Sequence, residues 1–366
     1  MKDKITIILF ILLLFLMFII NAVSPVKDIS YSERRKLTRF PSLTMKLIFN
    51  GKFMEDFEKY ALDQFPFRDN FRSIKAHFEL DIFRKLDNNN VYTIDDNLFK
   101  IEYPIKPHNI QKTIDHMNTV YNLYLKGMNV YYSIIPDKSY FAADKRGYLG
   151  LDYIMLENMM RENIKDIIYI DIFDTLTLDD YYNTDVHWRQ EKLDKVVSRI
   201  IHAMGLEESP EDGDYTQKQY YPFYGAYYGQ SALNPKPDTL IYRTNPYIDA
   251  AKVYNYDPSI DKDAPFSVYN EDSLGTVDSY DVFLWGASPI IEIMGDNIKT
   301  DRELIIFRDS FASSIAPLLL EHYSKITLID TRYVNHKLLG SFVEFKDQDV
   351  LFLYNTVLIN NGNILK

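Results

Sequence analysis

The sequence predicts an α/β protein built around a mostly parallel β-sheet. From about residue 91 onward, short and continuously apolar runs alternate with stretches of helical periodicity. Strands that are apolar on both faces are typical of a parallel sheet covered by helices on each side. The predicted strands are 129–135, 167–172, 281–285, 304–307, 326–329 and 350–354, and the predicted helices are 110–126, 152–163, 188–204 and 313–323. In such a sheet the reactive loops collect at the carboxyl ends of the strands.

The composition is that of a folded protein, and it excludes several classes of function. Of the 366 residues, 46% are hydrophobic and 25% are charged, which is typical of globular chains. The formal net charge of −11 argues against nucleic acid as a partner, because phosphate binding needs a concentrated basic surface. The chain has no cysteine, so disulfides and thiolate metal sites are excluded.

The N-terminus carries an apolar run, residues 5–23, preceded by Lys2 and Lys4. A helix of this length spans about 28 Å, close to the hydrocarbon thickness of a bilayer. A cleaved signal peptide has a shorter apolar region and a small-x-small site, which the sequence matches poorly. We therefore expect residues 1–23 to be a retained single-pass anchor in the cell membrane, with an extracytoplasmic body and cleavage as the alternative.

Residues 24–90 are predicted to form a helical juxtamembrane region. Apolar residues recur at helical spacing from 47 to 61 and again from 71 to 86, with a proline-containing break between them and an Asp/Asn cluster after them. This region is either a stalk that packs on the body or a docking surface for a membrane partner. The α/β domain then occupies residues 91–366.

Two distant segments carry side chains that are suited to nucleophilic catalysis. Ser310 follows a predicted strand and precedes a predicted helix, a turn that exposes its hydroxyl. Asp185 lies two residues before His187 and could hold that imidazole in one tautomer, leaving its other nitrogen to take the serine proton. The simpler interpretation is a surface histidine with Asp185 and Ser310 as helix caps. A metal site at Asp185 and His187 lacks further ligands at a telling spacing, so no metal or other cofactor is expected.

Four segments resemble motifs of one bacterial family. Residues 32–41 (SERRKLTRFP) resemble an E-N-R-x-L-x-x-x-P opening, and residues 53–68 resemble an F-x-x-Y-x-x-D-x-x-P-x-R stretch. Residues 182–188 (YNTDVHW) match the signature of the family, with Val186 in place of its first His, and residues 308–314 (RDSFASS) resemble its serine block. On these motifs the chain resembles the DHHW family of surface proteins, which are similar to the SGNH-hydrolase-like domains of alginate O-acetylation proteins.

The resemblance implies a fold and a role for each matched residue. The fold would be SGNH-hydrolase-like, with Ser310 as nucleophile, His187 as general base and then acid, and Asp185 as the group that orients the imidazole. Backbone N–H groups at Ser310 would face the oxyanion, and a second donor is expected near Gly286 or in the loop around Gln230.

Substrate contacts are expected from five residues near these motifs or in a tyrosine-rich segment, namely Trp188, Arg332, Tyr228, Gln230 and Gly286. Exposed tyrosines stack well on sugar rings, although the 29 tyrosines of the chain also fit a general compositional bias. An arginine at a strand end, such as Arg332, is as often part of a structural ion pair.

The function that the resemblance implies is acyl transfer. We expect a membrane-anchored O-acyltransferase, in particular an O-acetyltransferase, that modifies a cell-surface or exported polysaccharide. A multi-pass membrane acyltransferase would supply the acyl group. Two alternatives stay open, namely a carbohydrate esterase that uses water as acceptor and a non-catalytic glycan-binding scaffold of an acetylation complex.

Overall fold

The computed structural model of the protein describes residues 2–207, 214–256, 265–295 and 300–362. The chain divides into two compact units. The first contains Met1–Val91 together with Tyr228–Pro235, and the second contains Tyr92–Tyr227 together with Lys236–Lys366. No local pattern in the sequence indicated that a short segment from the middle of the α/β region groups with the N-terminal residues.

The N-terminal unit is mainly helical. Its elements are α1 (Lys2–Val23), β1 (Ile29–Ser30), β2 (Arg35–Lys36), α2 (Met45–Phe49), α3 (Lys52–Asp63), α4 (Arg68–His77) and the π-helical turn η1 (Phe78–Ile82). Within α1, the stretch Lys4–Val23 is long and apolar enough to cross a membrane, a property that an N-terminal signal sequence shares. It is the one helix of this kind among the described residues.

Ion pairs join the two N-terminal motifs of this unit. Asp63 accepts two hydrogen bonds from the Arg35 guanidinium, at 2.6 and 3.0 Å, and this pair holds the pKa of the Asp63 carboxyl well below its usual range. Glu33 accepts hydrogen bonds from Arg35 at 3.1 Å and from Arg68 at 2.5 Å. These ion pairs fix the β1–β2 hairpin against the corner between α3 and α4. The motifs therefore hold this unit together.

The segment Tyr228–Pro235 is held in the same unit through its backbone. Arg72 donates a hydrogen bond to the carbonyl of Gly229 at 2.6 Å, and Asn88 donates to the carbonyl of Ser231 at 2.8 Å. A side chain at Gly229 would overlap the backbone of Ser32, so the close approach requires glycine.

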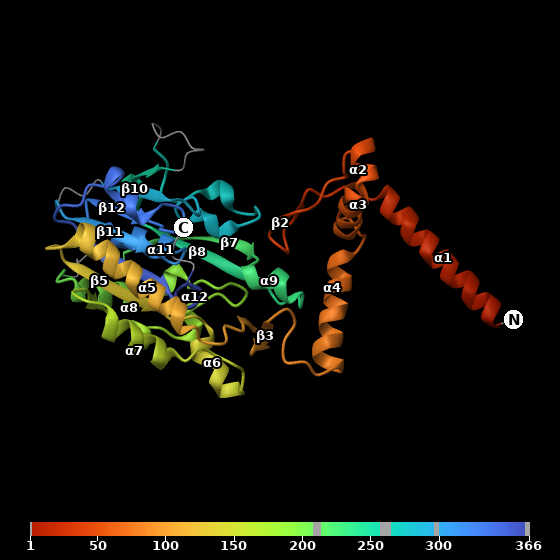
Figure 1. Ribbon diagram of the computed structural model, residues 1–366, viewed down its shortest axis with the longest axis horizontal. Helices are drawn as coiled ribbons and strands as arrows, with labels where there is room; N and C mark the ends of the chain where they lie inside the picture. The colour runs from red at the N-terminus through yellow and green to blue at the C-terminus, as the bar shows by residue number, and fades with distance from the viewer. Residues whose placement is uncertain (1, 208–213, 257–264, 296–299, 363–366) are drawn as a thin grey trace. The chain divides into compact units, whose positions relative to one another are not determined.

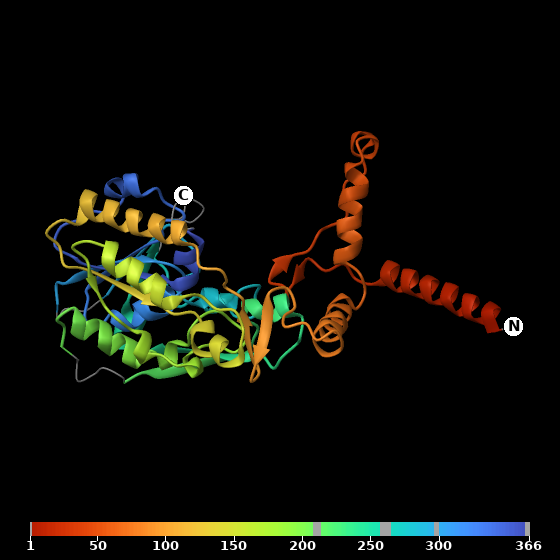
Figure 2. The same ribbon diagram turned by 60° about the horizontal axis from the view of Figure 1, so that its bottom comes forward.

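A seven-stranded sheet forms the centre of the second unit (Figures 1 and 2). The strand order is β6-β5-β13-β11-β12-β10-β9. The first five strands in this order are parallel, whereas β10 and β9 are antiparallel to their neighbours. Their bounds are β5 Val130–Ile135, β6 Ile168–Tyr169, β9 Lys252–Asn255, β10 Ile290–Met294, β11 Glu303–Arg308, β12 Lys325–Ile329 and β13 Asp349–Asn355. The predicted α/β class with a mostly parallel sheet is confirmed.

Successive residues of the central strands enter two hydrophobic cores. In β11, Leu304 and Ile306 belong to one core, whereas Ile305 and Phe307 belong to the other. The first core includes residues of α8 and α11, and the second includes residues of α5, α7 and α12. The helices of the unit are α5 Pro107–Val120, continued by the π-helical turn η2 Tyr121–Leu125, α6 Ser139–Arg146, α7 Tyr153–Asn163, α8 Asp194–Ala203, α10 Pro246–Ala250, α11 Ala312–Ile315 and α12 Thr356–Asn361. Helix α9, Ala226–Ser231, begins in this unit and continues into the segment Tyr228–Pro235 of the first. Because side chains alternate between the faces of a strand, both faces must be apolar, as the sequence indicated.

One predicted strand is wrong, and strands β9 and β10 of the seven-stranded sheet were not predicted. Residues 281–285 form part of a 3₁₀ turn, η7 (Ser279–Val282), followed by Leu284 and Trp285 with φ of 54° and 63°. A left-handed backbone cannot continue a strand, so the apolar run is buried in a loop. Strand β10 and the edge strand β9 occupy the antiparallel side of the sheet instead. The second unit also has two hairpins, β3 (Val91–Ile94) with β4 (Asn97–Lys100) and β7 (Thr216–Phe223) with β8 (Asp238–Thr244).

Candidate active site

Ser310 lies in the turn that connects β11 to α11, at the carboxyl end of a central parallel strand. The neighbouring Asp309 is buried and accepts hydrogen bonds from the backbone N–H of Phe311 at 3.0 Å and of Asn355 at 2.8 Å. Burial raises the pKa of Asp309, although both N–H donors oppose that effect. Because Asn355 ends β13, this carboxyl group ties the turn to the adjacent strand. The position of Ser310 is thereby fixed by the sheet.

The three residues singled out from the sequence form one chain of hydrogen bonds. His187 Nε2 lies 2.7 Å from Ser310 Oγ, and His187 Nδ1 lies 2.6 Å from Asp185 Oδ1. Asp185 is fully buried and also accepts hydrogen bonds from the backbone N–H of His187 at 3.0 Å and of Ala226 at 2.7 Å. With both carboxylate oxygens engaged, Asp185 acts as an acceptor for Nδ1–H and leaves Nε2 directed at the serine hydroxyl.

Tyr280 holds the imidazole from one face. Its ring is stacked on His187 with centroids 3.8 Å apart and an interplanar angle of 7°, and its hydroxyl donates to Ser314 Oγ at 3.0 Å. Burial raises the pKa of Tyr280 well above its usual value, so the hydroxyl stays protonated as a donor. Phe311 contacts the imidazole as well, at 4.9 Å between centroids. Sequence reasoning missed Tyr280, since nothing in its local pattern indicates this contact.

Trp188 packs against the turn that carries Ser310. It is fully buried, and its Nε1–H donates to the carbonyl of Phe311 at 3.1 Å and to Ser314 Oγ at 2.8 Å. The side chain therefore offers no surface to a substrate, contrary to the expectation of direct contact. Its indole instead connects the segment that carries His187 to the segment that carries Ser310.

A buried lysine holds the loop that leads into Asp185. Lys138 Nζ donates to the backbone carbonyls of Leu98, Tyr182 and Asn183, at 2.8, 2.6 and 2.9 Å. Its side chain is 2% exposed, and burial lowers the pKa of Lys138 to about 7, although Asp238 and Asp185 oppose that shift. Three carbonyl acceptors require all three protons of an ammonium group. Sequence reasoning missed this residue, although its place just after a predicted strand was a signal.

Asp238 holds the same loop from its backbone amides. Its carboxylate accepts hydrogen bonds from the N–H groups of Asn183 at 2.9 Å and of Thr184 at 2.8 Å, and from the Thr184 hydroxyl at 2.6 Å. Lys138 therefore engages the carbonyls of this loop while Asp238 engages its N–H groups. Hydrogen bonds to its carbonyl groups and to its N–H groups therefore hold the segment before Asp185 in one conformation.

Gly225 allows a second loop to approach Asp185, and its replacement is expected to separate them. A Cβ at this position would lie 2.3 Å from the Thr184 carbonyl oxygen, a backbone atom that cannot move aside. We expect Gly225→Ala to cost about 1–3 kcal/mol of stability and to withdraw the Ala226 N–H from Asp185. Thermal unfolding and ester turnover test this. Gly150→Ala, whose methyl would meet its nearest atom at 3.3 Å, serves as the control and should change both far less.

Arg332 and Gly286, two other residues that were predicted to contact substrate, form hydrogen bonds within the protein. Arg332 pairs with Asp330 through two hydrogen bonds of 2.8 and 2.6 Å, and its guanidinium lies over Tyr333. The N–H of Gly286 donates to the Phe283 carbonyl at 3.3 Å within a turn, so in this conformation it is engaged. Arg332 is thus part of an ion pair, which the sequence left as one of two interpretations.

Tyr228 and Gln230 belong to the N-terminal unit, whereas Ser310, His187 and Asp185 belong to the other unit. The amide of Gln230 donates to the carbonyl of Asn89 at 2.8 Å. Their role in substrate binding stays a prediction. Within the described ranges, no three His, Asp or Glu side chains lie where they could hold a metal ion.

Solved structures of other proteins share the fold of this chain. A DHHW family protein from Eubacterium siraeum is 19% identical, with a TM-score of 0.63, over 76% of this chain and 95% of its own. PatB1 of Bacillus cereus, solved with a sulfonyl adduct, is 17% identical with a TM-score of 0.59, over 74% of this chain and 97% of its own. The O-acetyltransferase domain of Pseudomonas putida AlgJ is more distant, at 12% identity and a TM-score of 0.46, over 74% of this chain and 92% of its own.

The amino-acid sequence compared by itself has no significant match. No family model matches the chain, and no curated protein matches it significantly. At these low identities the structural likeness concerns the fold. As a likeness of fold, the resemblance to the DHHW family that the sequence motifs predicted is confirmed.

Proposed function

We propose that the protein is a membrane-anchored, extracytoplasmic O-acyltransferase that transfers an acyl group, in particular acetyl, to a cell-surface or exported polysaccharide. The observation that carries this proposal is the continuous hydrogen-bonded chain from Asp185 through His187 to Ser310 Oγ. A serine activated by an imidazole that is itself oriented by a buried carboxylate is suited to attack an ester carbonyl.

The first half-reaction forms an acyl-enzyme. His187 Nε2 takes the hydroxyl proton as Ser310 Oγ bonds to the acyl carbonyl carbon, and Asp185 stabilises the resulting imidazolium. The backbone N–H of Ser310 donates no hydrogen bond among the described residues, and we propose that it faces the oxyanion. When the tetrahedral intermediate collapses, the bond to the donor oxygen breaks, and His187 returns the proton to that oxygen.

The second half-reaction regenerates the enzyme. His187 takes the proton from a sugar hydroxyl, whose oxygen attacks the acyl carbonyl, and the bond to Ser310 Oγ breaks as the proton returns to the serine. The membrane placement is supported by α1, and the choice of a glycan acceptor is supported by the motifs that resemble the DHHW family. A multi-pass membrane acyltransferase is the proposed source of the acyl group.

Trapping of Ser310 tests the proposal directly. PatB1, which shares the fold, has been solved with a sulfonyl adduct, and the same class of reagent suits this chain. We expect phenylmethylsulfonyl fluoride to add one sulfonyl group to the detergent-solubilised full chain, with loss of fluoride, as measured by intact mass. Ser310→Ala should take up none, His187→Ala should react much more slowly, and Ser198→Ala should react like the wild type. A wild type that stays unlabelled and hydrolyses no acetyl ester would leave the scaffold alternative.

Acceptor competition then separates transfer from hydrolysis. With p-nitrophenyl acetate as donor, a true acyltransferase yields acetylated oligosaccharide at the expense of free acetate as acceptor concentration rises. Mass spectrometry of the sugar and an assay of acetate measure the two products. If acetate alone forms at every acceptor concentration, the protein is an esterase.

A further inference from the structure

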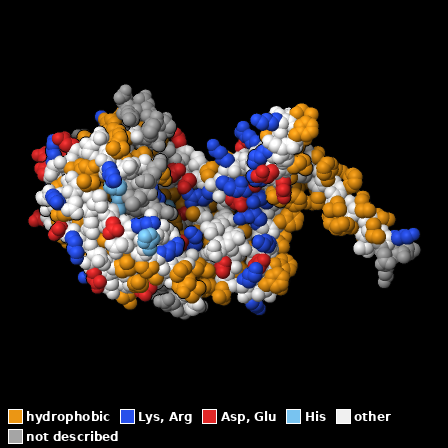
Figure 3. Space-filling model, viewed as in Figure 1, with side chains coloured by type: hydrophobic (Ala, Val, Ile, Leu, Met, Phe, Trp, Pro, Cys, Tyr) orange, Lys and Arg blue, Asp and Glu red, His pale blue; other side chains and the backbone are white. Residues whose placement is uncertain are grey.

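The helix α4 and its continuation η1 carry an exposed apolar stripe. Its members are three or four residues apart in sequence and between 48% and 61% exposed, namely Phe67 at the N-cap of α4, Phe71, Ile74, Phe78 and Ile82. An amphipathic helix of a soluble protein normally buries such a face against a core. Figure 3 shows hydrophobic side chains gathered over α1 and over parts of the helices that follow it. We call these five residues the α4 stripe.

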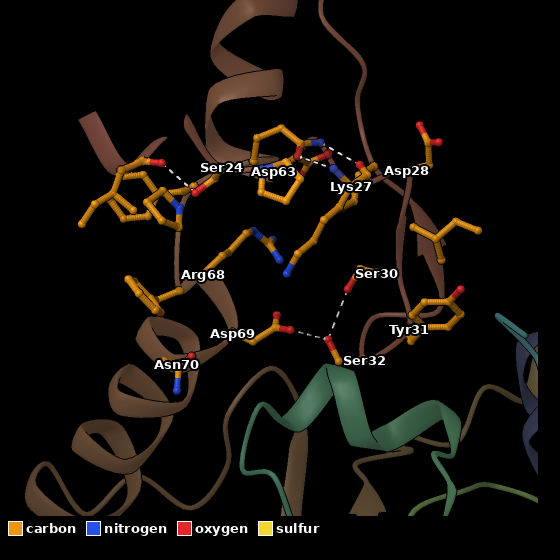
Figure 4. A pocket seen from close by; sticks show the side chains of 18 residues that line it. Ser24, Lys27, Asp28, Ser30, Tyr31, Ser32, Asp63, Arg68, Asp69 and Asn70 are labelled. Carbon is orange, nitrogen blue, oxygen red and sulfur yellow. Dashed lines mark hydrogen bonds between the residues drawn. The ribbon is translucent and has the colours of Figure 1, made fainter. Parts of the chain in front are cut away.

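The α4 stripe begins at the end of the proposed membrane span. A cavity of about 880 Å³ is lined by Ile20 and Ser24 from the end of α1, and by Phe67 and Arg68 where α4 begins. Lys27 and Arg68 extend into this cavity (Figure 4). Val23 ends the apolar helix. With α1 as the proposed span, these basic groups and the start of α4 would lie where the hydrocarbon gives way to lipid headgroups.

The charge and composition of residues 24–91, which follow α1, also favour a position at the membrane surface. Residues 24–91 contain thirteen Lys and Arg against ten Asp and Glu, although the whole chain has a net charge of −11. The short helix α2 adds further exposed apolar side chains, with Met45 67% and Phe49 82% exposed. Helices with exposed aromatic and aliphatic faces and basic flanks are the type that lies in a membrane interface.

We propose that α4 and η1 lie on the outer surface of the phospholipid bilayer, with the α4 stripe inserted among the lipid headgroups. This rests on the membrane-anchoring part of the proposed function and is independent of the chemistry at Ser310. Lipid is the occupant that the observations favour, because the stripe starts at the end of the span and any bilayer that holds α1 would meet it. Burial in the interface removes the exposed rings from water and stabilises this orientation.

Depth-dependent fluorescence quenching tests this placement in the intact chain. The absence of cysteine allows single labels without background substitutions. The full chain with Phe71→Cys or Phe78→Cys carries an environment-sensitive fluorophore in vesicles of phosphatidylcholine and phosphatidylglycerol, with or without lipids bearing a nitroxide near the headgroup. We expect several-fold stronger quenching at these sites than at His77→Cys, which lies off the stripe on the same helix, or at Ile154→Cys, which is equally apolar and 75% exposed but lies in the second unit.

A label on α1 makes the outcomes distinguishable. Quenching of Phe10→Cys by deep nitroxides together with quenching of the stripe supports both proposals. If Phe10→Cys is quenched and the stripe stays as unquenched as Ile154→Cys, the anchor holds and the interfacial placement is overturned. If neither is quenched, the anchor fails as well. Stripe labels that are unquenched in vesicles but shielded from a water-soluble quencher in native membranes would identify a protein partner and overturn the bilayer as the occupant.

Discussion

Asp185→Asn is expected to lower ester turnover by about 10³- to 10⁴-fold while leaving the fold intact. The carboxylate accepts hydrogen bonds from His187 Nδ1 and N with one oxygen and from Ala226 N with the other. An amide has one oxygen and one NH₂ group, so it cannot accept on both sides. If its oxygen faces His187, its NH₂ meets the Ala226 N–H, another donor.

The opposite orientation of the amide is unsuited to catalysis. If the NH₂ faces Nδ1, His187 must adopt the tautomer that carries its proton on Nε2, and Nε2 then cannot accept the proton of Ser310. The first orientation sets two donors against each other, and the second removes the general base from its working state, which is the reason for the large effect. The same reasoning predicts that Asp185→Ala is as inactive but less stable, because it leaves the N–H groups of His187 and Ala226 without their acceptor.

Steady-state turnover of p-nitrophenyl acetate, with thermal unfolding measured on the same samples, checks this prediction. Asp179→Asn is the matched control, since Asp179 is exposed and is not part of the candidate site, and it should retain wild-type turnover. Unchanged turnover in Asp185→Asn with normal stability would mean that Asp185 has only a structural role. The hydrogen-bonded chain would then not be the catalytic device.

Lys138→Met is expected to abolish a rise in stability that the wild type shows above neutral pH. Burial lowers the pKa of Lys138 to about 7 in the folded protein, whereas the unfolded chain titrates near the ordinary lysine value of about 10.4. Below pH 7 both states carry the proton, and the cost of burying the charge is present in full. Between these two pKa values the unfolded state binds more protons, so the free energy of unfolding increases with pH, by about 5 kcal/mol at most.

Chemical denaturation of the full chain in detergent between pH 6 and 10 measures this effect as the difference between wild type and Lys138→Met. The difference cancels titrations that both proteins share. Lys112→Met, which removes an exposed lysine, should keep the wild-type slope. Parallel stability curves for wild type and Lys138→Met would show that the ammonium group binds its three carbonyls without a lowered pKa.

Loss of the Lys138 proton has a consequence for the candidate site as well. A neutral amine has two protons for the carbonyls of Leu98, Tyr182 and Asn183, so one acceptor loses its donor as pH rises through about 7. The loop before Asp185 is then held less tightly. Lys138 is a positioning residue in this arrangement, because it contacts backbone groups and no reacting atom.

Local patterns in the sequence were sufficient for most of the architecture. Uninterrupted apolar runs predicted β5, β11, β12 and β13 within a residue or two, because a strand buried on both faces needs such a run whatever surrounds it. The turn at Ser310 followed from the same reasoning, since it comes between a strand and a helix. The D-x-H spacing placed an acceptor beside His187 through a contact of only two residues in sequence.

Contacts between distant residues required the tertiary structure. Tyr280 stacks on His187, Lys138 binds the carbonyl of Tyr182 from 44 residues away, and Trp188 is buried against Phe311 from 123 residues away. The run 281–285 is as apolar as a strand but lies in a turn, because burial selects apolar residues without selecting a backbone conformation. The sequence by itself therefore determined the fold class and the identity of the candidate catalytic groups. Their support, and the grouping of Tyr228–Pro235 with the N-terminal unit, were decided by packing between segments that no local pattern connects.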